Sequence, residues 1–178
     1  MPVSGTLMLA LLAMDSYNRG YLPGLDLAAA GASPTDIGSA TLRTDVLPSG
    51  SQAAGFFAQA YTISGGALAG KTVISYRGTD NPTPLAGPTG ASDILSGWVS
   101  GVGIPGSQVY LAEQFYNSVT GTTFLSGPAA NTILTGHSLG GGLAGYMAAL
   151  SGTQAQVFDA MPFGVEDLTP SEQEPCRQ

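Results

Sequence analysis

The chain has 178 residues, of which 43% are hydrophobic and 10% are charged, a balance that excludes intrinsic disorder and fits one folded domain with a buried core. The formal net charge is −7 and the five lysines and arginines are spread along the sequence, so a nucleic-acid-binding surface and a polybasic membrane anchor are both excluded. One cysteine, Cys176, and one histidine, His137, form no Cys/His cluster, and we expect no metal site and no cofactor.

The first predicted element is a helix over residues 6–18. It contains the apolar run TLMLALLAM, which is too short to span a membrane and lacks the basic start and the cleavage site of a secretion signal. Residues 20–52 are rich in Gly, Pro, Ser, Thr and Asp and are interpreted as a loop with room for a short helix. Aromatic and β-branched residues in 55–63 and 71–78 then predict two antiparallel strands joined by the turn GGALAG.

The second half of the chain alternates between helical and strand-like patterns. It predicts helices over 107–119 and 139–151 and short strands over 131–135 and 155–161. This alternation is typical of an α/β fold with a mostly parallel central sheet flanked by helices, here with an antiparallel N-terminal hairpin.

The composition of the sequence changes from residue 162 onward, where it becomes polar and acidic and shows no periodicity. We therefore predict one domain over residues 1–165 and an irregular polar tail over 166–178. Within that tail Cys176 is interpreted as an exposed, incidental thiol.

The pentapeptide GHSLG, residues 136–140, matches the G-x-S-x-G pattern of a nucleophile elbow. Because it follows an apolar strand and precedes a helix, Ser138 is predicted to sit on a strained turn at the carboxyl end of a strand, where open α/β sheets place their sites. The glycines two residues before and after it leave room for a close approach of the backbone. The N–H of Leu139, at the helix N-terminus, could then donate to an oxyanion. The alternative is a glycine-rich turn with an incidental serine.

These motifs resemble those of the class 3 (fungal-type) lipases of the α/β-hydrolase superfamily. TGHSLGGGLA is similar to their nucleophile elbow, VISYRGTD to their strand ending in Arg-Gly-Ser/Thr, and DILSGW to the Asp- and Trp-containing segment that follows. LALLAMDSYNRGY is similar to the helix that opens bacterial members, and the resemblance covers most of residues 6–165. It implies a partial α/β-hydrolase fold with Ser138 as nucleophile. It also implies an oxyanion hole made by Leu139 and by Thr79, which supplies a backbone N–H and often its side chain.

Two other side chains near these motifs allow two interpretations each. Arg77 ends an apolar strand, and we interpret it as a structural residue that pairs with Asp80 or Asp93 rather than as a catalytic group. Trp98 is interpreted as a packing residue rather than as a platform for substrate.

The base that a serine nucleophile requires is not evident. In α/β-hydrolases the order is Ser, then Asp or Glu, then His, but no histidine follows Ser138. Consecutive side chains diverge at an elbow, so His137 is expected to pack and not to act as the base. The resemblance places the acid on a later strand, so Asp159 is a weak candidate, and Glu166 and Asp167 are weaker still. We therefore expect a chain truncated at its C-terminus, with its triad acid and histidine missing.

The expected function is hydrolysis of carboxylic esters, mainly of acyl lipids, with very weak activity in this chain. One alternative is a hydrolase-fold domain that binds acyl chains or lipids without turnover, and another is a thioesterase or acyltransferase. A small-molecule or lipid ester is the expected partner, with transient contact to a lipid interface and no nucleic acid. Oligomeric state is left open, as is the choice between a cytoplasmic protein and one exported by a C-terminal signal.

Overall fold

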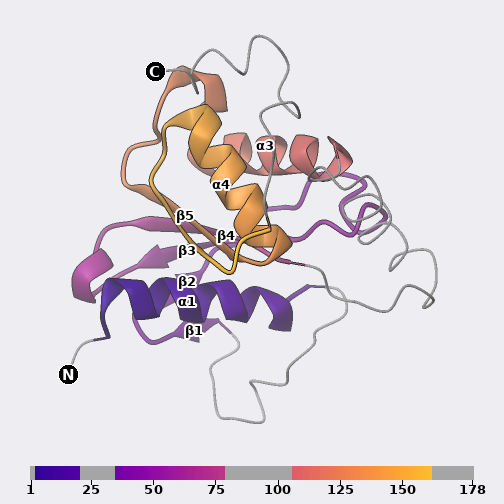
Figure 1. Ribbon diagram of the computed structural model, residues 1–178. Helices are drawn as coiled ribbons and strands as arrows, with labels where there is room; N and C mark the ends of the chain where they lie inside the picture. Colours follow the sequence, from indigo (N-terminus) through magenta and orange to yellow (C-terminus); the bar gives the residue numbers. More distant parts are fainter. Residues whose placement is uncertain (1–2, 21–34, 79–105, 162–178) are drawn as a thin grey trace.

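The computed structural model describes residues 3–20, 35–78 and 106–161 (Figure 1). Its helices are α1 (Gly5–Asp15), α3 (Gly106–Thr120) and α4 (Leu139–Ser151), with the 3-10 turns η1 (Ser16–Asn18), η2 (Gly66–Leu68) and η3 (Phe124–Ser126). Its strands are β1 (Asp36–Ile37), β2 (Ala40–Leu42), β3 (Ala58–Ile63), β4 (Thr72–Tyr76), β5 (Thr132–His137) and β6 (Ala155–Phe158).

All described strands belong to one six-stranded sheet in the order β1-β2-β3-β4-β5-β6. The pairs from β1 to β4 are antiparallel, whereas β4–β5 and β5–β6 are parallel. It follows that β2, β4, β5 and β6 run in one direction, against β1 and β3. The α/β fold class with its antiparallel hairpin β3–β4 is therefore confirmed.

The interpretation of residues 20–52 as a loop is wrong for two short stretches, β1 and β2. β2 pairs with β3 over only three positions, Ala40 with Ile63, Thr41 with Thr62 and Leu42 with Tyr61. Strands of two and three residues are too short to produce a visible alternation of apolar and polar residues. Ala40 is fully buried in the core. We attribute the position of β2 in the sheet to this burial and not to a local sequence pattern.

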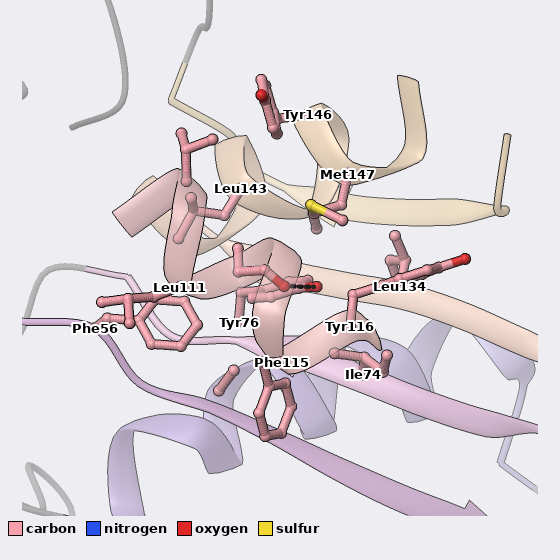
Figure 2. Packing of buried hydrophobic residues seen from close by; sticks show 14 of the residues in the cluster. Phe56, Ile74, Tyr76, Leu111, Phe115, Tyr116, Leu134, Leu143, Tyr146 and Met147 are labelled. Carbon is pink, nitrogen blue, oxygen red and sulfur yellow. Dashed lines mark hydrogen bonds between the residues drawn. The ribbon is translucent and has the colours of Figure 1, made fainter. Parts of the chain in front are cut away.

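The sheet is covered on both faces, by α1 on one and by α3 and α4 on the other (Figure 1). Successive side chains of a strand point to opposite faces, so Val73 packs in the cluster beneath α1, and the next residue, Ile74, in the cluster beneath α3 and α4. Figure 2 shows the second cluster, in which Tyr76 and Phe115 lie among aliphatic side chains. The three layers explain why so much of the chain is apolar.

The helix α1 confirms the element predicted over 6–18, although it ends at Asp15 and continues as the turn η1. The Ser4 side chain caps it by accepting a hydrogen bond from the Leu7 N–H at 3.2 Å. Its inner side is buried through Met8, Leu9 and Leu12. None of the helices in the described ranges has the length and apolar character that crossing a membrane requires.

Candidate active site

The predicted elbow lies where β5 ends and α4 begins. Ser138 separates the two elements with φ 56° and ψ −125°, a conformation that residues with a side chain rarely adopt. The Ser138 N–H donates to the Phe158 carbonyl at 3.1 Å, and its carbonyl accepts from the N–H groups of Gly142 at 3.0 Å and Met161 at 2.9 Å. The strained turn is thus held by β6 on one side and by the first turn of α4 on the other, with Ser138 only partly buried.

Two glycines allow the backbone to close around Ser138, as expected from the motif. A Cβ atom on Gly136 would lie 2.3 Å from the Gly140 carbonyl oxygen, and one on Gly140 would lie 2.1 Å from the Tyr76 carbonyl oxygen. Both clashes are with backbone, which cannot rotate away as a side chain can. The close approach of Gly140 to the Tyr76 carbonyl also places the elbow directly beside the end of β4.

Leu139 is the first residue of α4, and its side chain is buried at 2% exposure. The first N–H groups of a helix have no acceptor within the helix, and the macrodipole makes this end positive. An oxyanion beside Ser138 would meet this end of α4. The other predicted contributor, Thr79, lies outside the described residues, as do Asp80, Asp93, Trp98, Glu166, Asp167 and Cys176.

The imidazole of His137 is held by a residue from the opposite end of the sequence. Tyr17, in the turn η1, places its hydroxyl oxygen 3.0 Å from His137 Nδ1 and 3.3 Å from the His137 carbonyl oxygen. The two rings meet edge to face, with centroids 5.9 Å apart. These contacts support the packing role expected for His137.

The turn that carries Tyr17 is anchored by a buried carboxylate. Asp15 is 1% exposed and accepts from Arg19 Nε at 2.8 Å and from the Tyr61 hydroxyl at 2.7 Å. Burial, and then the negative charge of Asp15, raise the pKa of the Tyr61 hydroxyl far above its ordinary value. Tyr61 therefore stays protonated and remains a donor to Asp15.

Arg77 follows β4 and is 2% exposed. Its Nη1 donates to the Arg19 carbonyl at 3.0 Å, and its guanidinium lies over the Phe57 ring at 4.5 Å from the centroid. These contacts support the structural interpretation, while the proposed partners Asp80 and Asp93 lie outside the described residues. Arg77 thereby joins the end of β4 to the segment after η1.

Asp159 follows β6 directly and is exposed, with φ 45°. The predicted strand 155–161 is therefore too long, because the chain leaves the extended conformation at Asp159 and turns back so that Met161 can bind the Ser138 carbonyl. Among the described residues the Asp159 carboxylate has no ion-pair or hydrogen-bond partner. It lies on the turn beside the elbow but has no imidazole to orient there.

Comparison with known proteins identifies the family. A family model described as a Tle-like phospholipase domain, within a phospholipase-like family, matches residues 8–169. The chain belongs to this phospholipase-like family. No curated protein and no solved structure matches it. A lipase- or phospholipase-like family is thus confirmed, whereas the finer assignment to the class 3 lipases stays a prediction.

Other kinds of site can be compared with the elbow only within the part of the domain that the structure describes. Within the described ranges no group of three or more His, Cys, Asp or Glu residues could hold a metal. Two hollows of about 260 and 490 Å³ both include Gly5 and Leu68, so they lie at the other end of α1 from Tyr17 and the elbow. The residue that sequence reasoning missed is Tyr17, because nothing local in its sequence indicates a contact with His137.

Proposed function

We propose that this phospholipase-like domain carries the nucleophile and the oxyanion-binding part of a serine lipid esterase of the class 3 lipase type. The observation that supports this most is the strained conformation of Ser138 between β5 and α4, in a chain whose family is phospholipase-like. A merely structural serine would gain nothing from that conformation. The substrate class is a carboxylic ester of an acyl lipid.

In this mechanism Ser138 Oγ attacks the acyl carbonyl carbon and loses its proton to a base. The N–H groups of Leu139 and Thr79 hold the oxyanion that forms. Collapse of the tetrahedral intermediate releases the alcohol, which takes up the proton, and water then hydrolyses the acyl-serine by the reverse sequence of proton transfers. The base is a histidine not found after Ser138 in these 178 residues, so the chain itself is expected to turn over esters very slowly.

Labelling with a fluorophosphonate probe tests this proposal, because the probe reports nucleophile activation without needing complete turnover. We expect slow, covalent labelling that maps to Ser138 and disappears in Ser138→Ala, together with very weak hydrolysis of a phospholipid or a p-nitrophenyl ester. Fast hydrolysis that depends on Ser138 would show that the base is present after all. Acyl-chain binding without any labelling would instead favour the alternative function, a binding domain without turnover.

We also propose that the domain makes transient contact with a lipid surface through the outer side of α1. Three large apolar residues repeat along that side at 42 to 52% exposure, Leu7, Leu11 and Met14, and Val3 just before the helix is 40% exposed. No charged residue occurs between Ser4 and Met14, and a helix that is apolar on all sides is normally covered. Because the whole chain is acidic, at −7, the favoured surface is zwitterionic rather than anionic.

A further inference from the structure

The contact between Tyr17 and His137 involves one hydroxyl and two atoms of the same histidine. The Tyr17 oxygen is 3.0 Å from Nδ1 and 3.3 Å from the carbonyl oxygen of His137. The hydroxyl has a single proton, and a carbonyl oxygen can only accept. Both contacts can therefore be hydrogen bonds only if the hydroxyl donates to the carbonyl oxygen and accepts from Nδ1–H.

The other tautomer of His137 satisfies fewer groups. With the proton on Nε2, the unprotonated Nδ1 competes with the carbonyl oxygen for the one hydroxyl proton, so one of the two contacts is lost. A partly buried acceptor that loses its hydrogen bond costs free energy. Of the two tautomers, the geometry thus favours the one with its proton on Nδ1.

The Tyr17 hydroxyl also sits against the end of the strand that leads to Thr79. A Cβ atom on Gly78 would lie 2.1 Å from the Tyr17 oxygen and 2.6 Å from the His137 carbonyl oxygen. Three segments therefore meet at one hydroxyl: η1, the elbow, and the residues that follow β4. Replacement of the Gly78 hydrogen by any side chain would separate them.

The turn η1 cannot easily move away from this junction. Asp15 at its start is fixed by Arg19 and by the Tyr61 hydroxyl, and Arg77 donates to the Arg19 carbonyl just after it. Tyr17 is thus presented by a turn that is bonded to β3 and to the end of β4. Such support is what holds a positioning group within a few tenths of an ångström.

We propose that Tyr17 is a positioning residue of the active site, which locks His137 as the Nδ1–H tautomer and thereby fixes the elbow against the strand end that precedes Thr79. This inference rests on the proposed function, because Leu139 begins the helix at the elbow and Thr79 directly follows Gly78 in the sequence. Loss of the hydroxyl would let these segments drift, which weakens stabilisation of the oxyanion more than binding of the acyl chain.

The tautomer can be measured directly, because His137 is the only histidine in the chain. In mildly alkaline buffer, long-range ¹H–¹⁵N spectra of the full chain are expected to show one imidazole with a protonated Nδ1 and an unprotonated Nε2. Tyr17→Phe keeps the ring and removes both hydrogen bonds, so its spectrum should shift toward the Nε2–H form. A wild-type chain with the proton on Nε2 would overturn the proposal, whether or not Ser138 reacts.

The effect on Ser138 is measured by the kinetics of fluorophosphonate labelling, separated into probe binding and bond formation. Tyr17→Phe should slow bond formation about 3- to 10-fold with probe binding unchanged. The matched control is Tyr116→Phe, which removes a buried hydrogen bond of 2.6 Å to Thr153 on the other face of the sheet. Equal slowing in both variants would reduce Tyr17 to a structural role and overturn the proposal.

The two readouts separate this inference from the function on which it rests. If the wild-type chain is not labelled at all, the proposed esterase function fails, and the positioning role fails with it even if the tautomer is as expected. If Ser138 is labelled at equal rates in the wild type and in Tyr17→Phe, the function stands and only the positioning role is rejected.

Discussion

Ser138, the proposed nucleophile, is held in a strained backbone conformation. Its φ of 56° and ψ of −125° are maintained by hydrogen bonds from Gly142 and Met161 to its carbonyl oxygen and from its N–H to Phe158. Strain of this kind costs about 1–3 kcal/mol and persists only where the surroundings enforce it. The free-energy cost of this conformation should therefore be measurable as a difference in the free energy of unfolding between variants at position 138.

We expect Ser138→Gly to have a free energy of unfolding about 1 kcal/mol higher than Ser138→Ala, because glycine adopts a positive φ without a clash of Cβ. Chemical denaturation of both variants measures this difference. Ser118, exposed within α3, is the matched control, where the order should reverse by about 1 kcal/mol because glycine is a poor helix former. An alanine variant as stable as the glycine variant at position 138 would show that the turn is not strained.

At the scale of elements, α1 has an inner side that packs against the sheet and an outer side that is exposed. Its inner side packs through Met8, Leu9 and Leu12, and its C-terminal end leads into the turn that carries Tyr17. Its outer side leaves Leu7 and Leu11 at 52% and 42% exposure. The helix thus connects an apolar surface to the elbow through a continuous stretch of backbone.

We expect the double variant Leu7→Gln, Leu11→Gln to bind phosphatidylcholine vesicles about tenfold more weakly, if the outer side of α1 contacts lipid. The reason is that two half-exposed leucine side chains would no longer transfer from water into the lipid surface. Co-sedimentation with vesicles measures the binding. Leu125→Gln, at a residue that is 56% exposed in η3, is the control of the same chemistry and should bind like the wild type. A preference for phosphatidylglycerol vesicles would contradict the charge argument.

At the scale of the whole molecule, tyrosine side chains are buried on both sides of the sheet. Tyr61 lies beneath α1 and Tyr76 beneath α3 and α4, each at 1% exposure or less. Burial is the main cause that raises the pKa of both hydroxyls above 10.0, followed by Asp15 for Tyr61 and by Tyr116 and Glu113 for Tyr76. Neither hydroxyl can ionise while the fold is intact at moderately alkaline pH.

This predicts a fall in stability at alkaline pH. A raised pKa in the folded state means that the unfolded chain loses these protons first, so stability is full below about pH 10 and decreases above it. The slope should approach about 1.4 kcal/mol per pH unit for each tyrosine, or about 2.8 for the two. Urea unfolding between about pH 9 and 11 measures it. Tyr61→Phe should halve the slope, and an unchanged slope in that variant would contradict the assignment.

The sequence predicts the centre of the molecule better than its periphery. The helix over 139–151 has the predicted bounds, and Gly136 and Gly140 meet backbone as the elbow pattern requires, because both depend on local spacing. β1 and β2 escape prediction because they owe their place to the core and not to their own pattern. The predicted strand 155–161 is too long because its end depends on a contact between Met161 and Ser138.

Part of the candidate site can likewise be predicted from the sequence and part of it cannot. Ser138 and the first turn of α4 are predictable from one short motif. The contact of Tyr17 with His137 joins residues that are 120 positions apart, and no local pattern encodes it. The roles of Leu139 and Thr79 in an oxyanion hole stay predictions.

The order of the strands has a consequence for folding. Each described strand pairs with the next described strand, but only the antiparallel pairs from β1 to β4 join segments close in sequence, whereas the parallel pair β4–β5 joins distant ones. α1 also makes distant contacts, because the Leu9 carbonyl accepts from Thr135 Oγ1, 126 residues later, and Tyr17 must meet His137. During synthesis α1 therefore cannot complete these contacts until β5 has been made. Docking of α1 should be a late event, and until it occurs the elbow lacks the contact that fixes His137.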